Sequence, residues 1–155
     1  MKIEIIKRPD GTGVLRCTRQ DGSVTWQNQA RHAGHFAFHD LTHFAVETCL
    51  GYQRGFFGLI AAGWDIEDTT GKGTRGALPA ETIEVEQMVG LFDAERASNV
   101  LWSCEQFNDH APRALTPAEL QSVRALRGAL FHEWNATPPN RNLELTFALA
   151  STPSS

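Results

Sequence analysis

The stretch that decides the fold is KIEIIKRPDGTGVLRCTRQDGSVTWQ, residues 2–27. Ile3 and Ile5 alternate with charged residues, which is the period of a strand with one buried face. Two turn signals follow, PDG and DG, and they separate this strand from a second at 14–19 and a third at 23–27. The N-terminal part of the chain therefore predicts a three-stranded antiparallel meander.

After this meander the hydrophobic period becomes helical. The apolar spacing predicts a helix over 35–50, and Gly51 ends it. A second helical region is expected to start near Pro79 and to continue or restart until Pro112. A third begins at 116–119, where TPAE supplies an N-cap, a proline at the first helical position and a capping-box glutamate.

The C-terminal part returns to the period of a strand. Leu143, Leu145 and Phe147 alternate with polar or small residues. The order of elements predicts an α+β fold: an antiparallel sheet of about four strands, three N-terminal and one C-terminal, with three to four helices packed on it. We expect a single domain over 1–150 and a frayed tail at 151–155.

The composition excludes several classes of protein. With 155 residues, 41% hydrophobic residues and a net charge of -4, the sequence predicts a folded domain that binds no nucleic acid. The longest apolar stretch, GFFGLIAAGW at 55–64, is far shorter than the roughly 20 residues of a membrane span, so no membrane association is expected. Three widely spaced cysteines and a charged, alternating start favour a cytoplasmic protein without disulfides or a signal peptide.

One segment, HFAFHDLTHFAVETC at 35–49, contains several side chains that can bind a metal or transfer a proton. On a helical projection, its central polar arc consists of His39, Asp40, His43 and Glu47. Solvated helix faces are normally built from Lys, Arg, Gln and Glu, and this arc has no lysine or arginine. We therefore expect a metal or acid–base site, although a structural or solvated face remains the alternative.

The spacing of the histidines favours a metal. His39 and His43 are four residues apart, about 6 Å along one face, so that their nitrogens can converge on one ion. Glu47 lies about 12 Å along the axis from His39, so we expect either the pair His39–His43 or the pair His43–Glu47, with a further ligand from another element. We favour His35 and keep the other candidates open, namely His32, His110, His132, Glu133, Asp65, Glu67 and Asp68.

Three resemblances rest on these residues. The segment HDLTH, followed by a glycine- and phenylalanine-rich stretch over 39–64, resembles small uncharacterised bacterial proteins, which implies no particular activity. HDxxH is also similar to the HExxH of zinc metalloproteases, with Asp40 at the position of the glutamate base. The His39-Asp40 doublet resembles that of HD-type phosphohydrolases, whose upstream histidine helix has no counterpart among the strands expected here.

These observations lead to one hypothesis and two alternatives. The hypothesis is a metal-binding protein, a zinc-dependent hydrolase or one that uses another divalent transition metal, acting on a small molecule or peptide. Its metal ligands would be His39, His43 and His35, with Asp40 and Glu47 as catalytic or supporting carboxylates. The first alternative is a metal-free interaction domain or homodimer that uses the apolar stretch at 55–64. The second is a metal-free acid–base enzyme or a binder of a small polar ligand.

Overall fold

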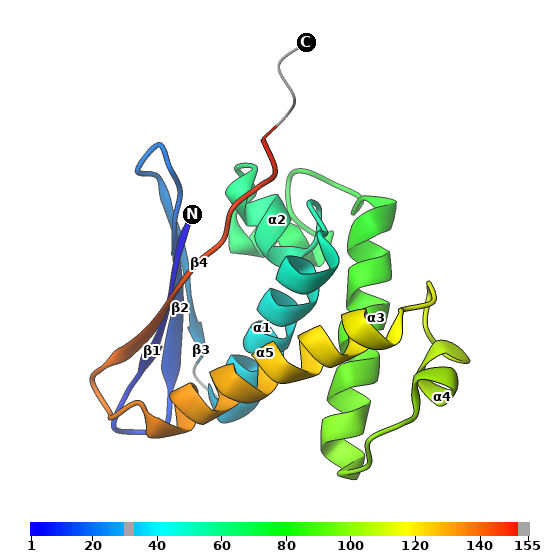
Figure 1. Cartoon of the computed structure of the whole chain (residues 1–155). Helices are drawn as coiled ribbons and strands as arrows, with labels where there is room; N and C mark the ends of the chain where they lie inside the picture. The colour runs from blue at the N-terminus through cyan, green and yellow to red at the C-terminus, as the bar shows by residue number, and fades with distance from the viewer. Residues whose placement is uncertain (30–32, 152–155) are drawn as a thin grey trace.

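The structure, a computed structural model of the chain, describes residues 1–29 and 33–151. Its sheet contains four antiparallel strands in the order β3-β2-β1-β4, with the C-terminal strand beside the N-terminal one (Figure 1). The fold is therefore α+β, as the sequence predicts. The strands are β1 (Lys2–Lys7), β2 (Gly13–Thr18), β3 (Val24–Gln29) and β4 (Asn142–Thr146).

The register of the strands places the apolar residues on one face of the sheet. Ile3 pairs with Cys17 on one side and with Leu145 on the other, and Cys17 in turn pairs with Thr25. Directly paired residues point to the same face, and Ile3 and Cys17 are completely buried. The alternation seen in the sequence thus gives the sheet a buried face for the helices and a face turned away from them.

Among the described residues, five α-helices and one short 3-10 helix lie on one side of the sheet, with α1 and α5 between the sheet and α3 (Figure 1). The predicted capping box is confirmed, because the Thr116 side chain accepts from the Glu119 amide and the Glu119 carboxylate accepts from the Thr116 amide. The helices are α1 (Ala33–Leu50), α2 (Phe56–Ala61), η1 (Ile66–Thr70), α3 (Ala80–Ser98), α4 (Cys104–Asn108) and α5 (Pro117–Ala136).

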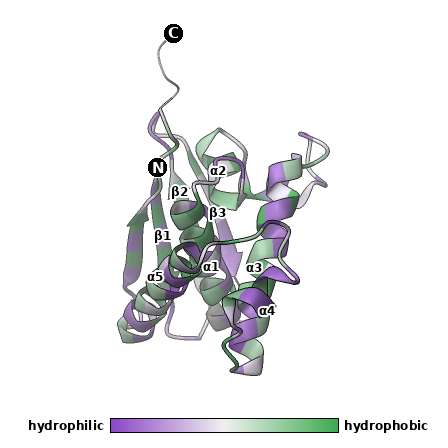
Figure 2. Ribbon diagram, turned by 45° about the vertical axis from the view of Figure 1, so that its right-hand side comes forward, coloured by the Kyte–Doolittle hydropathy of each residue, from purple (hydrophilic) through white to green (hydrophobic). Residues whose placement is uncertain are grey.

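The central helix α1 separates two hydrophobic cores. One core lies between the sheet, α1, α2 and α5, and it includes Ile5, Leu41 and Trp134. The other lies between α1, α3, α4 and α5, and it includes Val46 and Phe92. Hydrophobic residues gather along α1, which other elements surround (Figure 2). Packing of α3, α2 and β3 around α1 buries Asp40, His43 and Glu47, whereas the His39 side chain is 32% exposed.

The structure defines two segments whose form the sequence leaves open. Asn99, with φ 54°, ends α3 in a left-handed conformation, and the chain restarts as α4 after the N-cap Ser103. The apolar stretch at 55–64 folds into α2 and its flanks, where Phe57, Leu59 and Ile60 are at most 1% exposed. These buried side chains are not available for contact with a partner, whereas Phe56 and Trp64 of the same stretch are partly exposed.

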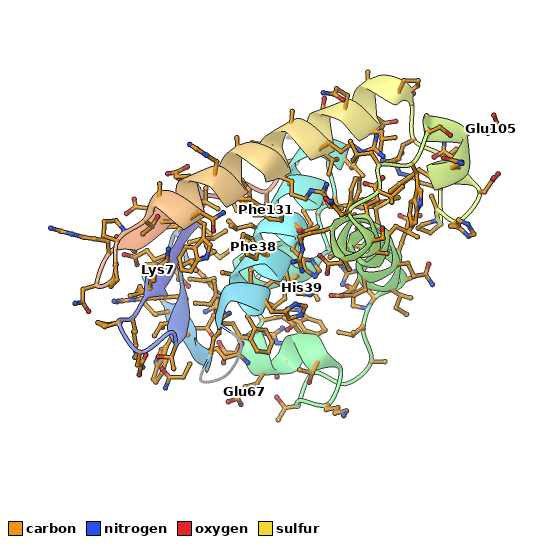
Figure 3. The ribbon with its side chains drawn as sticks, turned by 90° about the horizontal axis from the view of Figure 1, so that it is seen from below. Lys7, Phe38, His39, Glu67, Glu105 and Phe131 are labelled. Atoms are coloured by element: carbon orange, nitrogen blue, oxygen red, sulfur yellow. The ribbon has the colours of Figure 1, made fainter. Side chains whose placement is uncertain are left out.

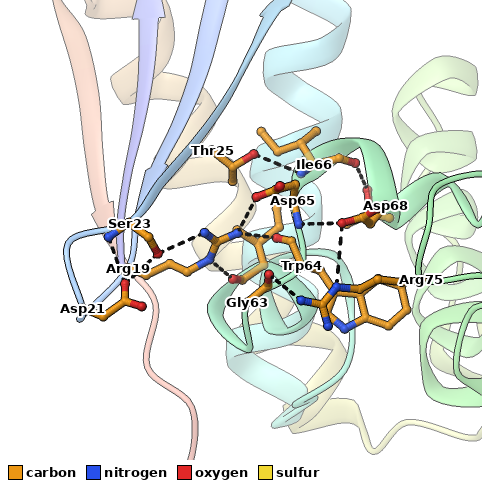
Figure 4. Close-up of polar contacts among 12 residues, drawn as sticks. Arg19, Asp21, Ser23, Thr25, Gly63, Trp64, Asp65, Ile66, Asp68 and Arg75 are labelled. Atoms are coloured by element: carbon orange, nitrogen blue, oxygen red, sulfur yellow. Dashed lines mark hydrogen bonds and ion pairs between the residues drawn. The ribbon is translucent and has the colours of Figure 1, made fainter.

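A buried arginine fastens the sheet to the segment after α2. The Arg19 guanidinium donates to the backbone oxygens of Ile60 at 2.7 Å and Trp64 at 2.6 Å, and it pairs with Asp65 at 3.1 Å (Figure 4). Nearby, the Thr25 hydroxyl accepts from the Ile66 amide. These contacts hold α2 and η1 against the β2–β3 hairpin. Helix α2 in turn contributes to the candidate metal centre.

Candidate metal centre

Helices α1 and α3 bring two histidines and a glutamate together. His39 and His43 lie one turn apart on α1, and Glu86 faces them from α3. One potential ligand atom from each of these side chains lies within 4.8 Å of the other two. In residues 1–29 and 33–151 this is the one group of three or more His, Cys, Asp or Glu side chains with such spacing. His43 forms its buried end and Glu86, with a side chain 46% exposed, its open end.

Both imidazoles are held at the same ring nitrogen. Nδ1 of His39 lies 2.8 Å from Oδ2 of Asp93, and Nδ1 of His43 lies 3.2 Å from Oε2 of Glu47. A carboxylate accepts hydrogen bonds only, so each Nδ1 must carry the proton, which leaves Nε2 as the atom that can bind a metal. Figure 3 shows His39 on the side of α1 that faces α3.

Glu47 is fixed by the short helix α2. Its Oε1 accepts from the Gly58 amide at 3.0 Å and its Oε2 from the Phe57 amide at 3.3 Å. Gly55 leaves the necessary space, because a Cβ there would lie 2.4 Å from Cδ of Glu47. With both oxygens engaged, Glu47 is a positioning group for His43 and does not reach the ligand group.

The charges around His43 favour its protonated form in the absence of a metal. Burial lowers the pKa of His43, but the hydrogen bonds and charges of Glu47 and Glu86 outweigh it and raise the pKa to about 10. For Glu86 burial raises the pKa, while the hydrogen bond and charge of His43 prevail and hold it below its ordinary value. Nε2 of His43 lies 3.3 Å from Oε1 of Glu86, where a proton or a metal ion can join them.

Asp40 points to a different part of the molecule. Its Oδ2 accepts from Nε2 of Gln29 in β3 at 2.7 Å. Burial raises its pKa to about 6, although the Gln29 hydrogen bond opposes the shift. In the part of the chain that the structure describes, no hydrogen bond or ion pair joins Asp40 to His39 or His43. The residue at the glutamate position of the HExxH pattern is thus placed apart from the ligand group.

The solvated-face alternative does not hold for the centre of the arc, because Asp40, His43 and Glu47 are at most 5% exposed. His35 is exposed and lies outside the ligand group, with its ring stacked on that of His39 at 6.3 Å between centroids. His32 lies outside the described residues. The remaining sequence candidates lie after α4, on α5 and in the region of η1, and none joins the group: His110, His132, Glu133, Asp65, Glu67 and Asp68.

Sequence reasoning missed Glu86 and Asp93. They are seven residues apart on α3 and therefore share one face, beside the predicted apolar stripe that includes Val85 and Phe92. This spacing was the available signal, since acids next to a buried stripe lie where the neighbouring helix packs. The identity of that neighbour, α1, depends on tertiary packing.

Comparisons of the chain with protein-family models, with curated proteins and with solved structures found no significant match. No helix among the described residues is long and apolar enough to cross a membrane. The geometry of His39, His43 and Glu86 is therefore the basis for a functional proposal.

Proposed function

We propose that this protein binds one divalent transition metal, zinc in the first instance, through His39, His43 and Glu86. The observation that carries the proposal is the shared arrangement of the two imidazoles. A carboxylate, Asp93 or Glu47, holds Nδ1 of each ring, and Nε2 of His43 lies 3.3 Å from Oε1 of Glu86. Such carboxylate–histidine pairs are the usual support of metal-binding histidines, because they fix the tautomer and the orientation of the ring.

The ligand set suits a reactive metal site. Two histidine nitrogens and one glutamate oxygen are ligands of catalytic zinc sites, in which a fourth position stays open for water or substrate. Glu86 lies at the exposed end of the group. When bound, such a metal would supply Lewis acidity and lower the pKa of its water. We propose hydrolysis of a small molecule or peptide on this basis.

Metal content tests the first part of the proposal. We expect the protein, purified without a histidine tag and loaded with zinc, to contain about one zinc ion per chain by elemental analysis. His39→Ala and Glu86→Gln remove one ligand each and should lower zinc affinity at least about tenfold. His35→Ala in the same helix and Glu105→Gln on α4 are the matched controls, and both should keep the ion. Substoichiometric zinc in the loaded wild type would overturn the proposal.

Glu86→Gln also separates a metal site from a structural ion-pair network. Its side chain is partly exposed, so the variant should fold, with the far-ultraviolet circular dichroism of the wild type. If the group binds zinc, the wild type should gain thermal stability on addition of zinc, because a ligand that binds only the folded state stabilises it. Glu86→Gln should show little of this gain. An equal gain in both proteins would place the ion elsewhere.

Hydrolysis is tested with a panel of ester, phosphoester and amide substrates. Activity must disappear on chelation, return with zinc and be absent from Glu86→Gln. Activity that survives chelation would favour a metal-free acid–base enzyme instead.

A homodimer remains a second candidate, with a new contact surface. Trp26 on β3 is 61% exposed and Val24 39% exposed, and both line a shallow depression on the outer face of the sheet with Val14 and Arg16. Exposed aromatic side chains with arginine are typical of protein contacts. Size-exclusion chromatography with light scattering should then show a dimer that Trp26→Ser converts to a monomer, and a strictly monomeric wild type would contradict this candidate.

A further inference from the structure

A pocket of about 240 Å³ lies where the C-terminal end of α3 meets α5. Its walls come from these two helices and from the loop that follows α3, and they include none of the proposed metal ligands. The pocket differs from the rest of this acidic protein in its chemistry, because Arg96 and Arg127 both line it.

Arg127 is a buried cation without a carboxylate partner. The residue is 9% exposed, and its one hydrogen bond in the described part of the chain is from Nη1 to the Phe92 backbone oxygen at 2.9 Å. The guanidinium lies over the rings of Phe92 at 5.3 Å and Phe131 at 5.8 Å. These contacts orient it, but they supply no negative charge. Burial of an unpaired cation is unfavourable, and it lowers the pKa of Arg127.

Arg96 adds a second donor that has no acceptor. Its Nε is buried without a hydrogen-bond partner, and its guanidinium lies 5.4 Å from the ring of Phe38. Phe38 and Phe131 contact each other between α1 and α5 (Figure 3). The aromatic rings thus hold both arginines beside the pocket and leave N–H groups free to bind an anion.

Neither of the two nearby carboxylates forms an ion pair with Arg96 or Arg127 among the described residues. Glu95 lines the pocket, but its oxygens accept from the Arg124 side chain and from the Trp102 amide. Oδ2 of Asp93 is paired with His39, and its Oδ1 is buried without a hydrogen-bond partner in the described part of the chain. Arg124 also donates to the Trp102 backbone oxygen at 2.8 Å. The region thus contains the three guanidinium groups of Arg96, Arg124 and Arg127 but only two carboxylates, those of Glu95 and Asp93. The sum of these side-chain charges is positive.

The mouth of the pocket is apolar. Val100 is 54% exposed and Leu101 70% exposed, and both line the pocket together with Phe131. Large apolar side chains with this exposure in a loop are typical of a surface that contacts an apolar group. The pocket therefore combines a cationic wall with an apolar rim.

We propose that this pocket binds a small organic anion whose carboxylate contacts Arg96 and Arg127 and whose short apolar part covers Val100 and Leu101. A guanidinium donates two parallel hydrogen bonds to a carboxylate, and a carboxylate at this place neutralises Arg127. The volume fits a compact ligand, because sites for drug-sized molecules start at about 300 Å³.

Sodium hexanoate is the probe that tests this site. The full chain is first stripped of metal by dialysis, so that the carboxylate cannot bind at His39 and His43. We expect saturable one-to-one binding by calorimetry, in the range of about 0.1 to 1 mM. Amide resonances of Gly128 and Asn99, which line the pocket, should shift with the same affinity. Absence of saturation up to about ten times that range would overturn the proposal.

Variants and analogues locate the binding and identify its chemistry. Arg96→Gln should weaken hexanoate binding about tenfold or more, since a charge-assisted bidentate contact is lost. Arg127→Lys keeps the positive charge but removes the planar guanidinium with its two parallel N–H donors. We expect a similar loss of affinity for hexanoate. Arg141→Gln, at an exposed arginine far from the pocket, is the control and should leave binding unchanged. An equal loss in Arg141→Gln, or unchanged binding in Arg96→Gln, would overturn the assignment.

Neutral hexanamide should bind at least about tenfold more weakly than hexanoate, since it lacks the charge that the guanidinium groups require. Inorganic phosphate should also bind more weakly, since it has no apolar part. Equal binding of hexanamide would overturn the cationic recognition, and equal binding of phosphate would overturn the role of Val100 and Leu101.

Discussion

His43 and Glu47 form a buried pair one turn apart on α1, with Nδ1 of the imidazole 3.2 Å from Oε2 of the carboxylate. The side chains are 2% and 0% exposed, and two amides of α2 donate to the same carboxylate. This relationship sets the tautomer of His43. It also links α2, which carries no proposed ligand, to the chemistry of the helix pair α1 and α3.

Replacement of Glu47 with glutamine should therefore impair metal binding without unfolding the protein. The glutamine oxygen can still accept from Gly58, but its amide group now donates to Nδ1 of His43. Nδ1 must then accept, so the neutral imidazole carries its proton on Nε2, which is the proposed ligand atom. We expect zinc affinity to fall about 10- to 100-fold, measured by competition with a chelating indicator.

Glu133→Gln at an exposed position on α5 is the control for this substitution. Wild-type zinc affinity in Glu47→Gln, with the fold intact, would show that Glu47 does not act through His43.

The pKa of His43 predicts how zinc binding depends on pH. Its value of about 10 in the metal-free protein means that zinc must displace a proton from the imidazole throughout the neutral range. Apparent zinc affinity should rise about tenfold per pH unit between about pH 6 and 8, because one proton is released. Calorimetry in buffers of different ionisation enthalpy measures that proton directly. A flat affinity profile without proton release would contradict the protonated state of His43.

Without metal the same group makes stability depend on pH. Because the folded-state pKa lies above the ordinary value of 6.5, the imidazolium contributes stability that is fully present below about pH 6.5. This contribution is lost as the pH rises through about 10. Urea unfolding of the metal-free protein should show the decrease, and His43→Gln should remove it.

The sequence predicted the sheet well because each strand carries its own pattern. Alternation of Ile3 and Ile5, turn signals and the capping box at Thr116 are local, and all of them are confirmed. The proximity of His39 and His43 was equally local, since four residues make one helical turn. Glu86 was out of reach, because its place beside His43 depends on the packing of α3 against α1.

Asp40 and Glu47 show the same limit in another form. Both belong to the polar arc of α1, and the sequence treats them as equivalent. Their roles diverge because different elements cover them: Gln29 of β3 contacts Asp40, whereas the amides of α2 contact Glu47. A helical projection identifies the arc but not the elements that pack on each side of it.

Asp40→Asn should stabilise the metal-free protein at neutral pH. The pKa of Asp40 rises from 3.8 to about 6 in the folded state, so the folded protein binds more protons in that window. Stability therefore falls as the pH rises through it and stays lower above it. Asparagine avoids this cost and brings a donor for Oε1 of Gln29, which is buried without a partner. We expect a gain of about 2–3 kcal/mol at pH 7 by urea unfolding.

The gain should vanish near pH 4, where the Asp40 carboxyl is protonated in the folded state. Asp109→Asn, at an exposed position after α4, should change stability little at either pH. If Asp40→Asn is no more stable than the wild type at pH 7, the buried carboxylate of Asp40 does not destabilise the folded protein.

Gly55→Ala should lower both stability and zinc affinity, although Gly55 is neither a ligand nor strained. Its φ of -82° suits alanine, but the new Cβ would lie 2.4 Å from Cδ of Glu47. Glu47 must then move, and its hydrogen bonds with Gly58 and His43 weaken. We expect a loss of about 1–3 kcal/mol in the free energy of unfolding and weaker zinc binding.

Gly128→Ala in α5 is the matched control, because nothing lies within 4 Å of a Cβ at that position. It should stabilise the helix by up to about 1 kcal/mol and leave zinc affinity unchanged. The informative comparison is therefore between two glycine-to-alanine changes that are expected to change the free energy of unfolding in opposite directions. If Gly55→Ala lowers stability but binds zinc like the wild type, Glu47 supports only the packing of α2, and the positioning of His43 must come from elsewhere.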